Sequence, residues 1–241
     1  MRCMNLVHSD NGVYSLTPTG MAFVQTLGDN CALTARSKRL LIKQALVCPP
    51  IRLLLSQFVP EKEFQHLGEY FQSSRPAFLE VDRRDKVVMR TDSDYRFTLK
   101  NEAEVNQFRR GAFTIAQQLE LIDVLRLPKS RTVLENQRTV IFPCIPLVLS
   151  QRTVLDSEFR EWILKLKNAD RRVSIGELTY LFCTENKYPV SAFQEQATDY
   201  LERHSTSYYL ERVSASNVSH SNSHAYLKVG GVWRSTIYVN A

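Results

Sequence analysis

Few side chains in this sequence have the types and spacing that catalysis or metal binding requires. His220 and His224 lie four residues apart, which on a helix would suit zinc, but their loop is rich in Ser and Asn and has no Cys or acid nearby. Glu80 and Asp82 share one face of a predicted strand, as nuclease carboxylates do, yet Arg84 stands where such a site needs a lysine. The sequence therefore predicts no metal site, no cofactor and no catalytic residues.

Motifs and compartment signals point the same way. Phosphate-binding loops, zinc-peptidase motifs and serine-hydrolase motifs are missing. The five cysteines are scattered and odd in number, which is typical of reduced intracellular thiols. No apolar run approaches the ~18 residues of a membrane span, and no signal-peptide core follows Met1. We therefore expect a cytoplasmic protein that is not an enzyme and does not contact a membrane.

Clustered basic residues suggest binding rather than catalysis. The 241 residues include 31 Lys+Arg and 25 Asp+Glu, a net charge of +6, which permits an anionic partner without requiring one. Guanidinium and ammonium groups would bind DNA phosphates in a salt-dependent way, although each cluster alone is also typical of a solvated surface. The candidate DNA-binding residues are Arg36, Lys38, Arg39, Arg83, Arg84, Arg171, Arg172, Gln194 and Arg234.

The N-terminal residues predict a hairpin followed by a helix. Residues 4–7 and 13–16 alternate like strands around Asn11-Gly12, a strong signal for a tight turn. Thr17 can cap the next helix and Pro18 suits its first position, so we expect a helix that ends at Gly28.

The middle of the chain predicts three helices, a hairpin and a long helix. The helices cover 34–47, 51–58 and 61–71, and the strands 78–81 and 86–90 carry Arg83 and Arg84 at their turn. An apolar stripe then predicts one helix from Asn101 to about Leu125. Residues 127–138 read as an irregular link, and 140–149, with two prolines, as a buried connection or an edge piece.

The C-terminal part repeats the order of helices followed by a hairpin. A helix opens at Asp156, a second begins at Ser174, whose spacing to Glu177 predicts a capping box, and a third follows Pro189. Strands are predicted at 208–213, 225–229 and 232–239, with Gly230-Gly231 as a turn.

Residues 4–27 resemble the wing and following helix of winged helix-turn-helix proteins, where a strand, a Gly-containing turn and Tyr-x-Leu-Thr-x-x-Gly occur in this order. Here Tyr14-Ser15-Leu16-Thr17-Pro18-Thr19-Gly20 carries the likeness. The helix–hairpin order at 34–92 and 157–240 is similar. The resemblance implies an α+β fold of two or three winged-helix-like modules joined by a long helix. It divides the chain into 1–30, 34–100, 101–155 and 156–241. Because the family's recognition helix precedes the wing, we expect the chain to begin inside a domain, with Leu6, Phe23 and Leu27 exposed.

In winged helices one helix enters the major groove of DNA. The resemblance and the basic clusters together predict non-enzymatic binding of double-stranded DNA, either as a transcription regulator or as the recognition component of a restriction or defence system. In the last module the groove helix would present Gln194 outward and bury Phe193, Ala197 and Leu201. Acidic Glu195, Asp199 and Glu202 would oppose phosphate binding.

Two alternatives therefore stay open: a winged-helix module that binds proteins, and the recognition part of a nuclease. The stripe of the 102–125 helix is equally consistent with packing inside the chain and with a homodimer.

Overall fold

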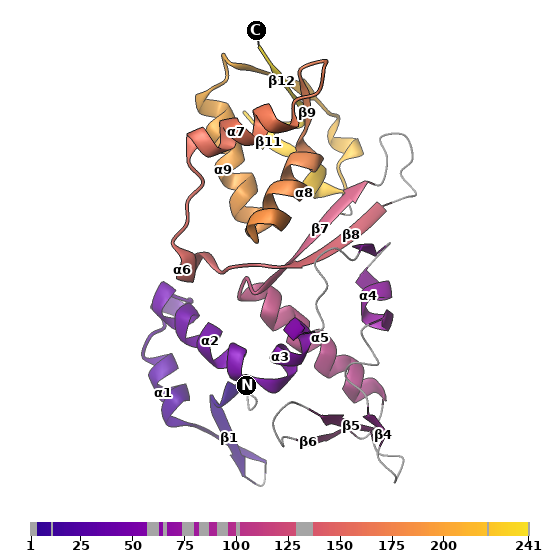
Figure 1. The fold of residues 1–241 in the computed structure, drawn as a ribbon. Helices are drawn as coiled ribbons and strands as arrows, with labels where there is room; N and C mark the ends of the chain where they lie inside the picture. Colours follow the sequence, from indigo (N-terminus) through magenta and orange to yellow (C-terminus); the bar gives the residue numbers. More distant parts are fainter. Residues whose placement is uncertain are drawn as a thin grey trace. The chain divides into compact units, whose positions relative to one another are not determined.

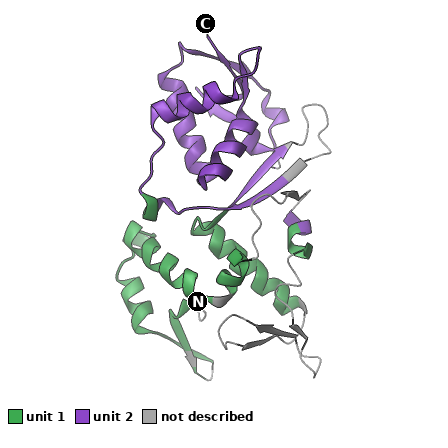
Figure 2. Ribbon diagram, viewed as in Figure 1, with its two compact units in different colours: residues 1–58, 70–122, 148–150 green, residues 59–69, 123–147, 151–241 purple. Residues whose placement is uncertain are grey.

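The structure is a computed structural model that describes residues 4–10, 12–56, 63–64, 67–73, 80–81, 87–90, 96–99, 102–128, 137–220 and 222–240. The chain forms two compact units (Figures 1 and 2). Unit 1 comprises Met1–Phe58, Tyr70–Ile122 and Val148–Ser150, and unit 2 comprises Val59–Glu69, Asp123–Leu147 and Gln151–Ala241. The fold class is mixed α+β, as expected, whereas the predicted domain boundaries stay predictions.

Unit 1 opens with the predicted hairpin and helix. Strands β1 (Val7–Asp10) and β2 (Val13–Leu16) pair antiparallel, and Gly12 takes a left-handed φ of 84° in their turn. Helix α1 (Pro18–Val24) is capped by Thr17, whose hydroxyl accepts a hydrogen bond from the Gly20 N–H at 2.9 Å and donates one to the Asn5 carbonyl at 2.6 Å. The predicted hairpin, the Thr17 cap and the start of the helix are therefore confirmed, whereas the predicted end at Gly28 is wrong because α1 ends at Val24.

The expectation that Leu6 is exposed is wrong, because its side chain is 2% exposed. The cause is the close approach of α1 to the hairpin at Gly20. A Cβ on Gly20 would lie 1.9 Å from the Leu6 carbonyl oxygen, so only glycine permits this contact. Phe23 and Leu27 are half-buried.

Further helices complete unit 1. A 3-10 turn (Asp29–Cys31) leads into α2 (Ala35–Val47), α3 (Pro49–Ser56) and, later in the chain, α5 (Glu102–Gln118). Buried side chains of these helices include Ile42, Ile51, Leu54, Val105 and Phe113. Helix α4 (Leu67–Ser73) contributes Tyr70, whose ring centroid lies 5.5 Å from that of Phe113. Burial raises the pKa of the Tyr70 hydroxyl to about 12.

Two helix predictions in this region are wrong. Instead of one helix over 61–71, the structure has strand β3 (Glu63–Phe64), which pairs with β8 (Gln137–Pro143), followed by α4. The long helix ends at Gln118 rather than near Leu125, because Glu120 adopts a left-handed φ of 57° and the Leu121 N–H bonds back to the Ala116 carbonyl. The predicted hairpin is present as β4 (Glu80–Val81) and β5 (Val87–Arg90), with β6 (Arg96–Leu99) as a third strand.

The apolar stripe of α5 is buried within unit 1. Val105, Ala112, Phe113 and Ala116 are each at most 6% exposed. The stripe therefore serves the interior of the unit, and the homodimer through this helix stays a prediction. None of the helices that the structure describes is long and apolar enough to cross a membrane.

Unit 2 begins with a sheet that was not expected. Strand β8 (Gln137–Pro143) lies between β3 and β7 (Ile122–Pro128), so residues 140–143 form a central strand rather than an edge piece. The prolines allow this because Pro143 is the last residue of the strand and Pro146 precedes the short helix α6 (Leu147–Ser150).

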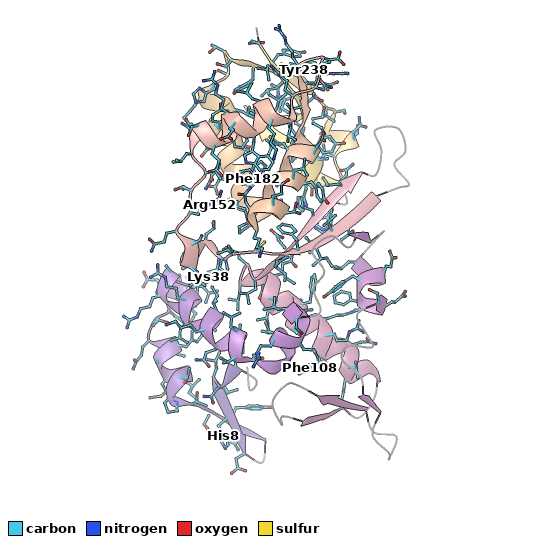
Figure 3. The ribbon with its side chains drawn as sticks, in the orientation of Figure 1. His8, Lys38, Phe108, Arg152, Phe182 and Tyr238 are labelled. Atoms are coloured by element: carbon cyan, nitrogen blue, oxygen red, sulfur yellow. The ribbon has the colours of Figure 1, made fainter. Side chains whose placement is uncertain are left out.

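Three helices form the body of unit 2: α7 (Asp156–Leu166), α8 (Ile175–Asn186) and α9 (Val190–Arg203). Stacked rings fill the space between them, with Phe193 at 5.5 Å from Phe159 and at 4.7 Å from Phe182 (Figure 3 labels Phe182). Phe193, Ala197 and Leu201 are fully buried, as predicted for α9.

The starts of α8 and α9 differ from expectation. Ser174 makes no side-chain capping bond, since it belongs to strand β9 (Arg172–Ser174) and pairs with Thr236. Helix α9 has no cap of its own, and Asp123 of β7 supplies one: its Oδ2 accepts from the Val190 N–H at 2.8 Å while its Oδ1 accepts from the Val124 N–H at 2.7 Å.

In the second sheet of unit 2, β12 (Val232–Val239) pairs with three other strands. Strands β9 and β11 (Leu227–Val229) pair with β12, as does β10 (Tyr208–Arg212). The β10–β12 register shifts after Glu211, and the extra residue is Ser235, whose hydroxyl contacts Glu211 and Thr236. This bulge turns Arg234 away from the face that carries Thr236.

Candidate nucleic-acid interface

Helix α2 presents a row of exposed basic side chains on one face. Arg36, Arg39 and Lys43 are all exposed and follow the i, i+3, i+7 spacing of one helix face. At 1.5 Å rise per residue the ends of this row are about 10 Å apart. The row, called the α2 basic face below, consists of these three residues.

The electrostatics of α2 favour an anion on this face. The helix contains no Asp or Glu, and Arg36 and Arg39 lie near its N-terminus. Because the N-terminal end of a helix is already partly positive, cations there oppose the helix dipole and destabilise the helix slightly. A phosphate at this position would relieve that repulsion.

Lys38, a candidate from the sequence, does not belong to this face. Its ammonium group makes an ion pair with Glu120, and both side chains are largely buried (Figure 3 labels Lys38). Arg39 donates from Nε to the Val148 carbonyl at 2.9 Å, which orients its guanidinium while the side chain stays exposed. The candidates on α2 thus divide into two surface cations and one neutralised cation.

Arg171 and Arg172 lie in unit 2, at the start of β9. Arg171 is exposed and has a left-handed φ of 58°. Arg172 bonds Asp170 at 2.6 Å, and this carboxylate, together with the Tyr238 hydroxyl, raises the guanidinium pKa. Its charge is therefore balanced locally, in contrast to the α2 basic face.

Gln194 and Arg234, the remaining described candidates, have intramolecular partners. Gln194 on α9 donates to the Tyr226 carbonyl at 3.2 Å, and Arg234 on β12 donates to the Leu210 carbonyl at 2.8 Å. Both side chains are half-buried. Arg83 and Arg84 lie outside the described residues.

The exposed face of α9 is acidic. Glu195, Asp199 and Glu202 are exposed at i, i+4 and i+7 spacing. Glu202 also accepts a hydrogen bond from the Gly230 N–H at 2.8 Å, which holds the β11–β12 turn against the end of α9. A row of carboxylates of this kind repels DNA phosphates.

Chemically reactive groups are sparse in the described part of the chain. No group of three or more His, Cys, Asp or Glu residues there could hold a metal ion. The His224 Nδ1 atom accepts from the Arg126 N–H at 3.0 Å, and burial, followed by the charge of Arg126, lowers the His224 pKa to about 4. Burial raises the pKa of the Cys183 thiol, which makes it a poor nucleophile.

Two residues outside the candidate list define this interface. Lys43, which the sequence places on the same basic helix as Arg36 and Arg39, completes the α2 basic face. Glu120 neutralises Lys38 from 82 residues away, and no local signal indicates that pairing. Comparisons with protein-family models, with curated proteins and with solved structures found no match to this chain.

Proposed function

We propose that this chain binds double-stranded DNA without catalysing a reaction, and that the α2 basic face makes the main contact with the phosphate backbone. The observation that carries the proposal is a helix with three exposed cations on one face and no acid anywhere along it. Such a face binds phosphates independently of base sequence. A transcription regulator and a DNA-recognition component of a defence system would both use it.

The topology of unit 2 supports a winged-helix-like module. Its order α7, β9, α8, α9, β10, β12, with β12 paired to both β9 and β10, is similar to the three helices and three-stranded wing sheet of that superfamily. Strand β11 is an additional element, which follows β10 in the sequence and pairs with β12. The winged-helix-like modules expected at residues 1–30 and 34–100 remain part of this proposal.

The acidic face of α9 favours protein binding as a second role for unit 2. In a winged helix that reads DNA, the helix equivalent to α9 approaches phosphates, and Glu195 and Asp199 would oppose that approach. Gln194, the candidate base-reading residue, is already bonded to Tyr226. We therefore assign DNA backbone contact to unit 1 and a protein partner with a basic surface to α9.

The experiment measures binding of the full chain to a labelled random duplex by fluorescence anisotropy between 50 and 300 mM salt. R36Q/R39Q/K43Q should reduce affinity at least tenfold and lower the slope of log K against log salt by about 2–3, since each lost phosphate contact removes about 0.9. The control R160Q/K167Q/K228Q removes three exposed cations from unit 2 and should leave the slope unchanged.

Absence of salt-dependent binding by the unmodified protein would reject the proposal. Equal losses in the two triple variants would show that net charge alone matters and would reject the assignment to α2. Q194A should bind all duplexes as the unmodified chain does, and a sequence-selective loss would return α9 to the role of groove reader.

A further inference from the structure

We infer that strand β2 is a dimerisation edge, on which a second copy of this chain adds its own β2 antiparallel across a two-fold axis. No residue of the α2 basic face takes part, so this inference stands apart from the proposed DNA binding. The inference rests on the exposed apolar side chains of β2, on the direction of its outer backbone groups and on the self-complementary order of its side chains.

Exposed apolar side chains concentrate on the hairpin and α1. All four residues of β2 are exposed. Side chains alternate along the strand, so Tyr14 and Leu16 lie on one face of the hairpin and Val13 on the other. The exposed apolar side chains are Val13 (70% exposed), Tyr14 (70%), Leu16 (47%), Met21 (54%) and Val24 (46%).

The backbone of β2 leaves donors and acceptors on its outer edge. The Thr17 N–H bonds the Leu6 carbonyl at 3.2 Å, which flanks the Val7–Leu16 pair and identifies it as a non-hydrogen-bonded pair. Bonding alternates along an antiparallel ladder, so Tyr14 and Leu16 direct their N–H and C=O groups away from β1. Among the described strands, only β1 pairs with β2.

This edge lacks the features that normally prevent pairing. Val13-Tyr14-Ser15-Leu16 contains no charge and no proline, and its register with β1 has no bulge. The opposite edge, β1, carries His8 and Asp10 (Figure 3 labels His8). A two-stranded hairpin is also only marginally stable alone, and further strands stabilise it. Pairing is thus favoured at β2 and opposed at β1.

The order of side chains in β2 fits a second copy. Residues whose backbone N–H and C=O groups point outward must pair with each other across the two copies. This sets Tyr14 opposite Leu16 of the other copy and places Ser15 opposite Ser15 on the two-fold axis. Each Tyr14 ring then lies opposite a Leu16 side chain of the other copy, and no two like charges are brought together.

Sedimentation velocity of the full chain between 1 and 100 µM tests the inference. We expect a species of twice 27.8 kDa for the unmodified protein. Ser15→Lys places two like charges at the axis and should weaken dimerisation at least tenfold. His8→Lys adds the same charge to the same face of the hairpin, on β1, and should leave the dimer intact.

A cysteine variant gives a positive readout that does not depend on disruption. Directly opposed non-bonded positions bring Cβ atoms to about 5 Å, within reach of a strained disulfide. In a C3S/C31S background, Ser15→Cys should form a covalent dimer on mild oxidation, whereas His8→Cys should not. A monomer at all concentrations, a dimer that survives Ser15→Lys, or equal cross-linking of the two cysteine variants would each overturn the inference.

Discussion

Helices α2 of unit 1 and α9 of unit 2 expose opposite charges although both are amphipathic and have similar lengths. Helix α2 presents Arg36, Arg39 and Lys43 and contains no acid, whereas α9 presents Glu195, Asp199 and Glu202. Their buried faces are alike, with Ile42 and Ala45 in one and Phe193 and Ala197 in the other.

The difference shows that order of elements and surface chemistry vary separately. Burial of an apolar stripe determines how a helix packs, while the solvent-facing side chains determine what it can bind. A likeness of element order therefore supports a similar fold for two modules without supporting a shared ligand.

Phe193→Ala should lower the free energy of unfolding by about 4 kcal/mol, because Phe193 is fully buried between Phe159 and Phe182. Phe113→Ala in unit 1 should cost about 3 kcal/mol, since its neighbour Phe71 is only half-buried and the site can relax. Urea unfolding followed by circular dichroism measures both. Equal costs would remove the distinction between the two interiors.

Acid should weaken unit 2 through His224. Its folded pKa, about 4, lies below the unfolded value of 6.5, so the unfolded state takes up a proton first and stability falls as pH drops from about 6.5 to about 4. The full effect is up to about 3 kcal/mol. His224→Asn retains an acceptor for the Arg126 N–H and should flatten the stability profile over this range in urea titrations. A profile that keeps its slope would assign the acid sensitivity to another group.

Reversing the charge of the exposed face of α9 should allow this helix to bind DNA phosphates, as we propose for α2. E195K/D199K should raise affinity for random duplex about tenfold at 50 mM salt, because added cations replace repulsive carboxylates on one face. E161K/E177K changes net charge equally at exposed positions of α7 and α8 and should raise affinity less than threefold. Equal gains would mean that the location of the acids on α9 is irrelevant.

The smallest contrast concerns helix starts. Thr17→Ala removes a side-chain cap from α1 and should cost about 1 kcal/mol, while Ser174→Ala removes no capping bond and should change stability by less than about 0.5 kcal/mol. Thermal unfolding of the two variants measures this difference. A larger loss for Ser174→Ala would contradict the hydrogen-bond assignment at α8.

Where structure depends on neighbours in sequence, the prediction succeeded. Gly12, Thr17 and Pro18 each act within a few residues, and the hairpin and α1 follow from them. The end of α5 was missed because Leu119, Ile122 and Leu125 continue the helical spacing beyond it. Ser174 was misread because its pairing with β12 involves residues about 60 positions later.

The candidate interface was predictable to a similar extent. The exposed cations Arg36 and Arg39 were identified from their spacing on one helix. The pairing of Lys38 with Glu120 and of Gln194 with the Tyr226 carbonyl depends on tertiary contacts, which spacing along the chain does not encode. The sequence therefore shows which side chains are charged, but it does not show which of them have partners within the fold.

The cap that Asp123 gives to α9 has a consequence for folding kinetics. The bond joins residues 67 positions apart, and closing such a loop costs about 4 kcal/mol of chain entropy before the contact is made. Its formation therefore awaits docking of β7 and raises the contact order of unit 2. A fragment that starts at Asp156 would lack this carboxylate, so truncation for expression should begin upstream of β7.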